Sequence, residues 1–145
     1  MPNRIFKNLK EKERVLARAV FTIKSAEERA FAKVTDSPKL IKGSFVMHYK
    51  GDIVGEGVLG ELKIFISDNL ATIYGLERIM GTLGEKKGTF VLQHTGIFRD
   101  GILNSRRTVV PGTGTGDLKG LTGEINFTSG PGEEFPVEFN YTFEN

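Results

Sequence analysis

The sequence predicts an all-β fold in which successive antiparallel strands form a meander that closes into a barrel. Three observations support this prediction. From about Ala17 onward, apolar and polar residues alternate with a period of two, as in strands with one buried face. Turn signals separate these segments at intervals of about a dozen residues. The chain has 18 glycines and only 5 prolines, a balance that favours tight strand connections over a helical bundle.

Length and charge predict one soluble domain. The 145 residues suffice for a single core, which we place at residues 17–145. Residues 1–16 form a charged extension, interpreted as a solvated leader or short helix, with an arm that binds a polyanion or protein partner as the alternative. The net charge of +2 is too small to indicate a nucleic-acid partner.

Several classes of protein are not expected. The absence of cysteine excludes disulfides and thiolate metal sites and favours a reducing compartment. Residues 1–18 carry charges throughout, and no apolar run is long enough to span a bilayer, so we expect a cytoplasmic protein without a membrane partner.

Four dipeptides mark the clearest two-residue turns: Lys50-Gly51, Asp68-Asn69, Glu85-Lys86 and Asp100-Gly101. Counting back from each turn predicts which residues lie opposite each other on adjacent strands. The predicted pairs include His94 with Arg107, Glu77 with His94, Ile79 with Leu92, Ile79 with Val58, Gly81 with Glu56 and Phe45 with Glu56.

This register sorts the side chains into two faces, because residues directly opposite share a face. The more apolar face, assigned to the barrel interior, collects Phe45, Met47, Tyr49, Val54, Val58, Leu62, Ile64, Ile73, Ile79, Phe90, Leu92, Phe98, Leu103 and Val109. The other face collects Ser44, His48, Lys63, Arg78, Gln93, Thr95, Asn104, Arg106 and Thr108, with Val46, Leu59, Leu76, Val91 and Ile97 among them. These outward apolar residues need cover from the N-terminal segment or another subunit.

The final segment supports the barrel. In Phe135–Asn145, one face is almost wholly aromatic and the other polar, as expected for a strand that lines a core. Apolar residues of the preceding and the first strands are expected to line the same core: Leu121, Ile125, Phe127, Phe21 and Ile23.

Two stretches resemble the signatures of a bacterial family of small uncharacterised proteins with an allene oxide cyclase-like barrel. They are YGLERIMGTLGEKKGTFVLQHTG (Tyr74–Gly96) and VVPGTGTGDLKGLTG (Val109–Gly123), and FTIKS (Phe21–Ser25) and YKGDIVGEG (Tyr49–Gly57) resemble the opening strands. The resemblance implies an eight-stranded antiparallel up-and-down barrel that assembles as a homo-oligomer, a dimer or trimer. It does not imply cyclase activity, because the catalytic motif of the plant cyclases has no residue-by-residue match here.

Glu77, His94 and Arg107 are the candidate catalytic residues. The register places them in one row of the interior face, with neighbouring Cβ atoms about 5 Å apart. A carboxylate that orients an imidazole forms a general acid/base, and a nearby arginine could hold a ligand carboxylate. The alternative is a buried structural network in which carboxylate, imidazole and guanidinium satisfy one another.

The interior is expected to bind a small, largely apolar or acidic ligand. The candidate contacts are Glu56, Tyr49, Phe45, Leu92, Phe90 and Tyr141. Glu56 is predicted to face inward, with space left beside it by Gly81, and Gly60 leaves space beside Glu77. Tyr49 and Tyr141 either turn their hydroxyls to water at a barrel mouth or pack in the core.

No metal site and no cofactor are expected. His48 is predicted to lie on the outer face, opposite to His94, and there is no cysteine. The loop at residues 111–116 lacks the Lys-Ser/Thr ending of a phosphate-binding loop and precedes a strand, so we interpret it as a flexible or bulged connection.

Three functions compete at this point. The first is a small-molecule-binding barrel. The second is an isomerase or cyclase that uses Glu77 and His94 as acid and base. The third is a non-catalytic interaction module that oligomerises through its apolar outer face.

Overall fold

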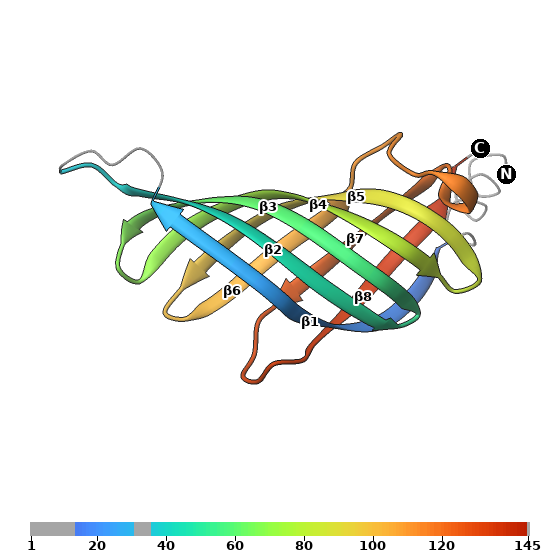
Figure 1. The fold of residues 1–145 in the computed structure, drawn as a ribbon, viewed down its shortest axis with the longest axis horizontal. Helices are drawn as coiled ribbons and strands as arrows, with labels where there is room; N and C mark the ends of the chain where they lie inside the picture. Colours follow the sequence, from blue (N-terminus) through green and yellow to red (C-terminus); the bar gives the residue numbers. More distant parts are fainter. Residues whose placement is uncertain (1–13, 31–35, 145) are drawn as a thin grey trace, which may run out of the picture.

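The computed structural model describes residues 14–30 and 36–144, which form a closed barrel of eight antiparallel strands (Figure 1). The strands are β1 (Val15–Ala30), β2 (Lys39–Gly51), β3 (Ile53–Ser67), β4 (Leu70–Leu83), β5 (Lys86–Arg99), β6 (Ile102–Val109), β7 (Leu121–Thr128) and β8 (Phe135–Phe143). A single 3₁₀ turn, η1 (Gly116–Leu118), precedes β7. Each strand pairs with the next, and β8 pairs with β1 to close the sheet. The predicted barrel is confirmed.

Most of the charged extension, residues 1–13, lies outside the described residues. Its last part does not stand apart from the barrel, because Val15 and Leu16 belong to β1 and pair with β8. Within the described part of the chain, no helix has the length and apolarity needed to cross a membrane.

The two ends of the barrel are built differently (Figure 1). At one end, here called the open end, lie the β3–β4 and β5–β6 turns and the projecting tips of β1 and β2. At the other end, here called the plugged end, residues 110–120 connect β6 to β7. The side chain of Leu118 from this connection is 1% exposed and belongs to the core cluster.

The plugging loop also completes the sheet beside β5. Strand β6 ends at Val109, opposite Leu92, so the first half of β5 has no strand on that side. Backbone amides of Thr89 and Val91 donate instead to the hydroxyls of Thr115 (3.0 Å) and Thr113 (3.1 Å). The glycine-rich connection between β6 and β7 is therefore a cap that satisfies backbone groups of β5.

The core fills the plugged half of the barrel with large apolar side chains. Phe90 and Phe139 stack with ring centroids 5.9 Å apart and are 2% and 0% exposed. As predicted, inward residues of the last two strands belong to the core cluster, and they are Leu121, Ile125, Phe127, Val137 and Phe139. Of the two residues predicted from the first strand, Phe21 belongs to the cluster, whereas Ile23 is 47% exposed. Burying each large apolar side chain contributes about 1.5–3 kcal/mol, which favours the closed barrel over an open sheet.

The predicted register is confirmed on one strand pair and shifted on three. Strands β5 and β6 pair as expected, with His94 opposite Arg107. On β4 and β5, Glu77 lies opposite Leu92, two residues from the predicted His94, because the turn comes one residue earlier. This shift leaves both faces as predicted.

The face of β3 is reversed. An irregularity between Phe65 and Ser67 shifts its pairing with β4, so that Ile79 lies opposite Gly57 and not the predicted Val58. Several residues assigned to the interior are therefore about half exposed on the outer surface: Val54, Val58 and Leu62. Leu59 and Lys63, assigned to the outside, line the interior.

Glu56 is the principal correction among the candidate ligand contacts. It faces solvent, where its Oε2 lies 3.3 Å from Nε2 of His48, and both side chains are about half exposed (50% and 48%). The predicted gap beside it does not exist, because a Cβ on Gly81 would collide with the backbone of Val54 and Gly55. Gly60, which was predicted to leave space beside Glu77, faces outward into open space.

Candidate functional site

A buried hydrogen-bonded cluster of Tyr49, Glu77 and His94 lies inside the barrel on three strands. The Nε2–H of His94 donates to Glu77 Oε1 at 2.8 Å. The hydroxyl of Tyr49 donates to Glu77 Oε2 at 2.5 Å. Both carboxylate oxygens are therefore occupied, and the Glu77 side chain is 0% exposed. The predicted contact between Glu77 and His94 exists, although the two residues are offset by two positions along their strands.

The glycine beside this cluster is Gly57, not the predicted Gly60. Gly57 lies opposite Met47 on β2 and Ile79 on β4. A Cβ at this position would collide with the carboxylate of Glu77. The missing side chain of Gly57 therefore makes room for a buried carboxylate on the adjacent strand.

Burial sets the protonation state of the two groups that donate to Glu77. Desolvation raises the pKa of Tyr49 well above its usual value of 10.0, and the adjacent Glu77 carboxylate acts in the same direction. Desolvation lowers the pKa of His94 below 6.5, against the opposing effect of its hydrogen bond to Glu77. Tyr49 and His94 are therefore neutral hydrogen-bond donors at neutral pH.

Arg107 lies opposite His94, as predicted, but does not form an ion pair with the Glu77 carboxylate, which the alternative of a structural network included. In residues 14–30 and 36–144, no carboxylate oxygen lies within the 4.0 Å ion-pair limit of the Arg107 guanidinium. Its Nε is 3.5 Å from the Ser105 hydroxyl, and its buried Nη1 has no hydrogen-bond partner there. The guanidinium carbon lies 4.6 Å from the ring centroid of Phe127 and 5.2 Å from that of Phe21, within the range of cation–π contacts.

A cavity of about 230 Å³ occupies the open half of the barrel above Arg107. Its walls are mainly apolar, and three charged residues also line it: Glu61, Lys63 and Arg107. The apolar walls include Phe21, Phe45, Leu59, Phe98, Leu103 and Phe127. This volume is below the roughly 300–1,000 Å³ of most ligand pockets, so the cavity suits a small molecule.

Glu61 and Lys63 were not recognised from the sequence as site residues. The side chain of Glu61 is 8% exposed, and that of Lys63 is 19% exposed. The Nζ of Lys63 lies 3.4 Å from Glu61 Oε1 and 2.7 Å from Glu28 Oε2. Burial raises the pKa of Glu61 above 4.5, while the positive charge of Lys63 opposes this shift.

Of the six predicted ligand contacts, Phe45 lines the cavity. Tyr49 is 4% exposed and donates to Glu77, so its hydroxyl does not face water. Phe90 and Leu92 are packed in the plugged half of the core. Tyr141 is partly buried beside Phe139 and Phe143, and desolvation raises its pKa above 10.0.

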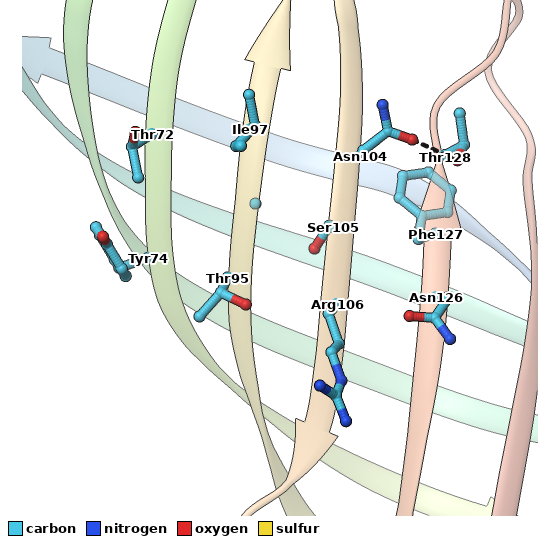
Figure 2. Close-up of a pocket in the computed structure, with 11 residues that line it drawn as sticks. Thr72, Tyr74, Thr95, Ile97, Asn104, Ser105, Arg106, Asn126, Phe127 and Thr128 are labelled. Atoms are coloured by element: carbon cyan, nitrogen blue, oxygen red, sulfur yellow. Dashed lines mark hydrogen bonds between the residues drawn. The ribbon is translucent and has the colours of Figure 1, made fainter.

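A second depression, of about 490 Å³, lies at Gly96 over β4 to β7 (Figure 2). Polar side chains around it include Thr72, Thr95, Asn104, Asn126 and Thr128. Several of these groups already have partners. Asn104 accepts a hydrogen bond from Thr128 at 2.7 Å, and Arg106 pairs with Glu124 at 2.7 Å. The interior cavity is lined by Arg107, whose guanidinium has no carboxylate partner among the described residues, and it is therefore the stronger candidate site.

The described residues contain no group of three or more His, Cys, Asp or Glu side chains placed to hold a metal ion. His48 and His94 lie on opposite sides of the barrel wall, as predicted, since His48 is exposed and His94 is 3% exposed.

Comparison with known proteins identifies relatives of unknown function. The model of DUF3224, described as a protein of unknown function, matches residues 17–141. A crystal structure of a DUF3224 protein with unknown function from Shewanella oneidensis MR-1 is similar, with 26% sequence identity and a TM-score of 0.74. The similarity covers 91% of this chain and 97% of that one. No curated protein matches the chain significantly.

Proposed function

Because the chain belongs to the DUF3224 family, whose function is unknown, we propose a function from the site itself: the barrel binds a small, largely apolar molecule in its open half. The observation that carries this proposal is the cavity of about 230 Å³ beside a tightly filled core. Apolar walls supply binding free energy, and a few polar groups orient the ligand.

Binding is better supported than catalysis by the isomerase or cyclase mechanism that uses Glu77 and His94. Among the described residues, neither Glu77 nor His94 lines the interior cavity, whereas Arg107 does. Both oxygens of Glu77 accept hydrogen bonds, and His94 donates one of them. His94 borders a separate depression of about 760 Å³ over the outside of β2 to β5. A general acid/base must reach the proton that it transfers, so towards a ligand in the interior cavity this cluster better suits a structural role.

Filling the cavity tests the proposal. We expect the wild-type protein to bind the neutral compound 3-phenylpropanamide saturably, with NMR shifts at the cavity-lining residues. Leu59 lines the cavity and is 6% exposed, so Leu59→Trp should weaken binding at least tenfold by occupying the space.

The matched control is Leu62→Trp, which introduces the same ring on the outer face of β3, where Leu62 is 45% exposed. This variant should bind as the wild type does. Equal binding by both variants, or no saturable binding by the wild type, would contradict the proposal. Native mass spectrometry of freshly purified protein would identify any molecule that copurifies with it.

A second candidate function, self-association, is favoured by the outer face of β3 and β4. Apolar side chains there are 45–61% exposed, and they are Val54, Val58, Leu62, Tyr74, Leu76 and Met80. Exposed apolar side chains gathered on one face are typical of protein interfaces. In the proposed homo-oligomer, a second copy of the chain would cover this outer face of β3 and β4.

Leu76→Lys should dissociate such an oligomer, because the interface would have to bury an unpaired charge. The measurement is the mass in solution by light scattering. Thr108→Lys, at an exposed position on β6, is the control and should leave the mass unchanged. A monomeric wild type would rule out this second function and leave the binding proposal unaffected.

A further inference from the structure

Arg107 lines the cavity, and among the described residues no carboxylate forms an ion pair with its guanidinium. From this we infer that the ligand is a small monocarboxylic acid with an apolar tail or ring, whose carboxylate binds to Arg107. The inference rests on the proposed function and specifies the chemical class of its ligand.

The first argument is the incomplete set of partners around Arg107. The residue is 4% exposed, its Nη1 has no partner among the described residues, and its Nε reaches only a 3.5 Å contact with Ser105. A buried arginine without a carboxylate is costly, because desolvation is not offset by charge-assisted hydrogen bonds. A ligand carboxylate would supply an opposite charge and charge-assisted hydrogen bonds, since its two oxygens match the guanidinium geometry.

The second argument is that the guanidinium is held in place before any ligand arrives. Phe127 and Phe21 lie 4.6 Å and 5.2 Å from its central carbon. These contacts lie within the range of cation–π interactions and restrict the position of the guanidinium. Pre-organisation of this kind lowers the entropy lost on binding.

The third argument is that neighbouring carboxyl groups select a single negative charge. Glu61 lines the same cavity, and Glu77 lies buried next to Arg107 in the Tyr49–Glu77–His94 cluster. The other cavity cation, Lys63, is already paired with Glu28 and Glu61. These carboxyl groups would repel a dianion such as a phosphate monoester more strongly than they would repel a monoanion.

The fourth argument is the shape of the rest of the cavity. The space of about 230 Å³ is walled by aromatic and aliphatic side chains, including Phe45, Leu59 and Phe98. These walls suit the apolar tail of a short alkyl or aryl acid.

Matched acid and amide pairs test the inference. At pH 7 the full chain is titrated with 3-phenylpropanoate and 3-phenylpropanamide, and with hexanoate and hexanamide, by NMR or calorimetry. Each pair differs in charge but hardly in size. We expect the wild type to bind each acid at least tenfold more tightly than its amide, and Arg107→Met to reduce this preference below twofold.

A second variant covers the possibility that Arg107→Met does not fold. Glu61→Gln removes a negative charge near the carboxylate and should increase the preference for the acid severalfold. Equal affinity for acid and amide in the wild type would overturn the inference and leave the proposed function standing. Absence of binding by both members of both pairs would overturn the inference and the proposed function together.

Discussion

Replacing Glu77 by Leu is expected to lower the free energy of unfolding by about 3–5 kcal/mol, the usual cost of removing one partner from a buried charged network. The change leaves the Tyr49 hydroxyl and the His94 Nε2–H without their acceptor. It also removes a negative charge that lies in the same part of the interior as Arg107. Urea denaturation followed by circular dichroism would measure the effect.

Glu56→Leu is the matched control on the outside of the barrel. Glu56 contacts His48 at 3.3 Å, and both side chains are about half exposed (50% and 48%). Such exposed pairs contribute about 0–1 kcal/mol, so the variant should unfold close to the wild type. Similar losses for the two variants would show that the cluster does not stabilise the interior.

Leu118→Ala is expected to lower the free energy of unfolding by about 2–5 kcal/mol, as for other buried leucines. Leu118 is 1% exposed and comes from the loop that closes the plugged end. Its loss would leave a void at this end and weaken the hydrogen bonds between the loop and β5. Thermal and urea unfolding would report the loss of stability.

The same substitution at Leu16, which is 41% exposed on β1, should change the stability by less than about 0.5 kcal/mol. Amide hydrogen exchange gives a local test at the plugged end. In Leu118→Ala, the amides of Thr89 and Val91 should exchange faster, since their acceptors lie on the loop. Unchanged exchange there would contradict the role assigned to the plug.

The sequence was sufficient to predict the barrel and much of its interior, because alternation and turn residues repeat over many strands. It was also sufficient to place Glu77, His94 and Arg107 inside, since the relevant faces of β4, β5 and β6 do not depend on the errors made elsewhere. Pairing between β4 and β5 was misplaced by two residues, an even number, and an even shift leaves every side chain on its face.

The face of β3 could not be predicted because two odd errors meet on it. Ile79 pairs with Gly57 and not Val58, a shift of one, and Phe45 pairs with Leu59 and not Glu56, a shift of three. Each odd shift reverses a face, so the two errors cancel on β2 and leave β3 alone reversed. The irregularity after Phe65 that causes the first shift has no mark in the sequence.

Hydrophobicity could not correct this error, because β3 has its more apolar side outside. Its outward residues include Val54, Val58 and Leu62, while Glu61 and Lys63 face inward. Natural sequences depart from the usual pattern mainly at functional positions. On β3, charged residues face inward and apolar residues face outward. This reversed pattern supports both the proposed ligand site in the cavity and the proposed interface on the outer face.

The plug also determines how a ligand would exchange. Because Leu118 and the large core side chains fill one end, the cavity is a blind recess and not a passage through the barrel. Molecules would enter and leave by the same route, because the plugged end is filled. One occupant must depart before the next can enter, so exchange would be limited by dissociation and could not be hastened by an excess of competitor.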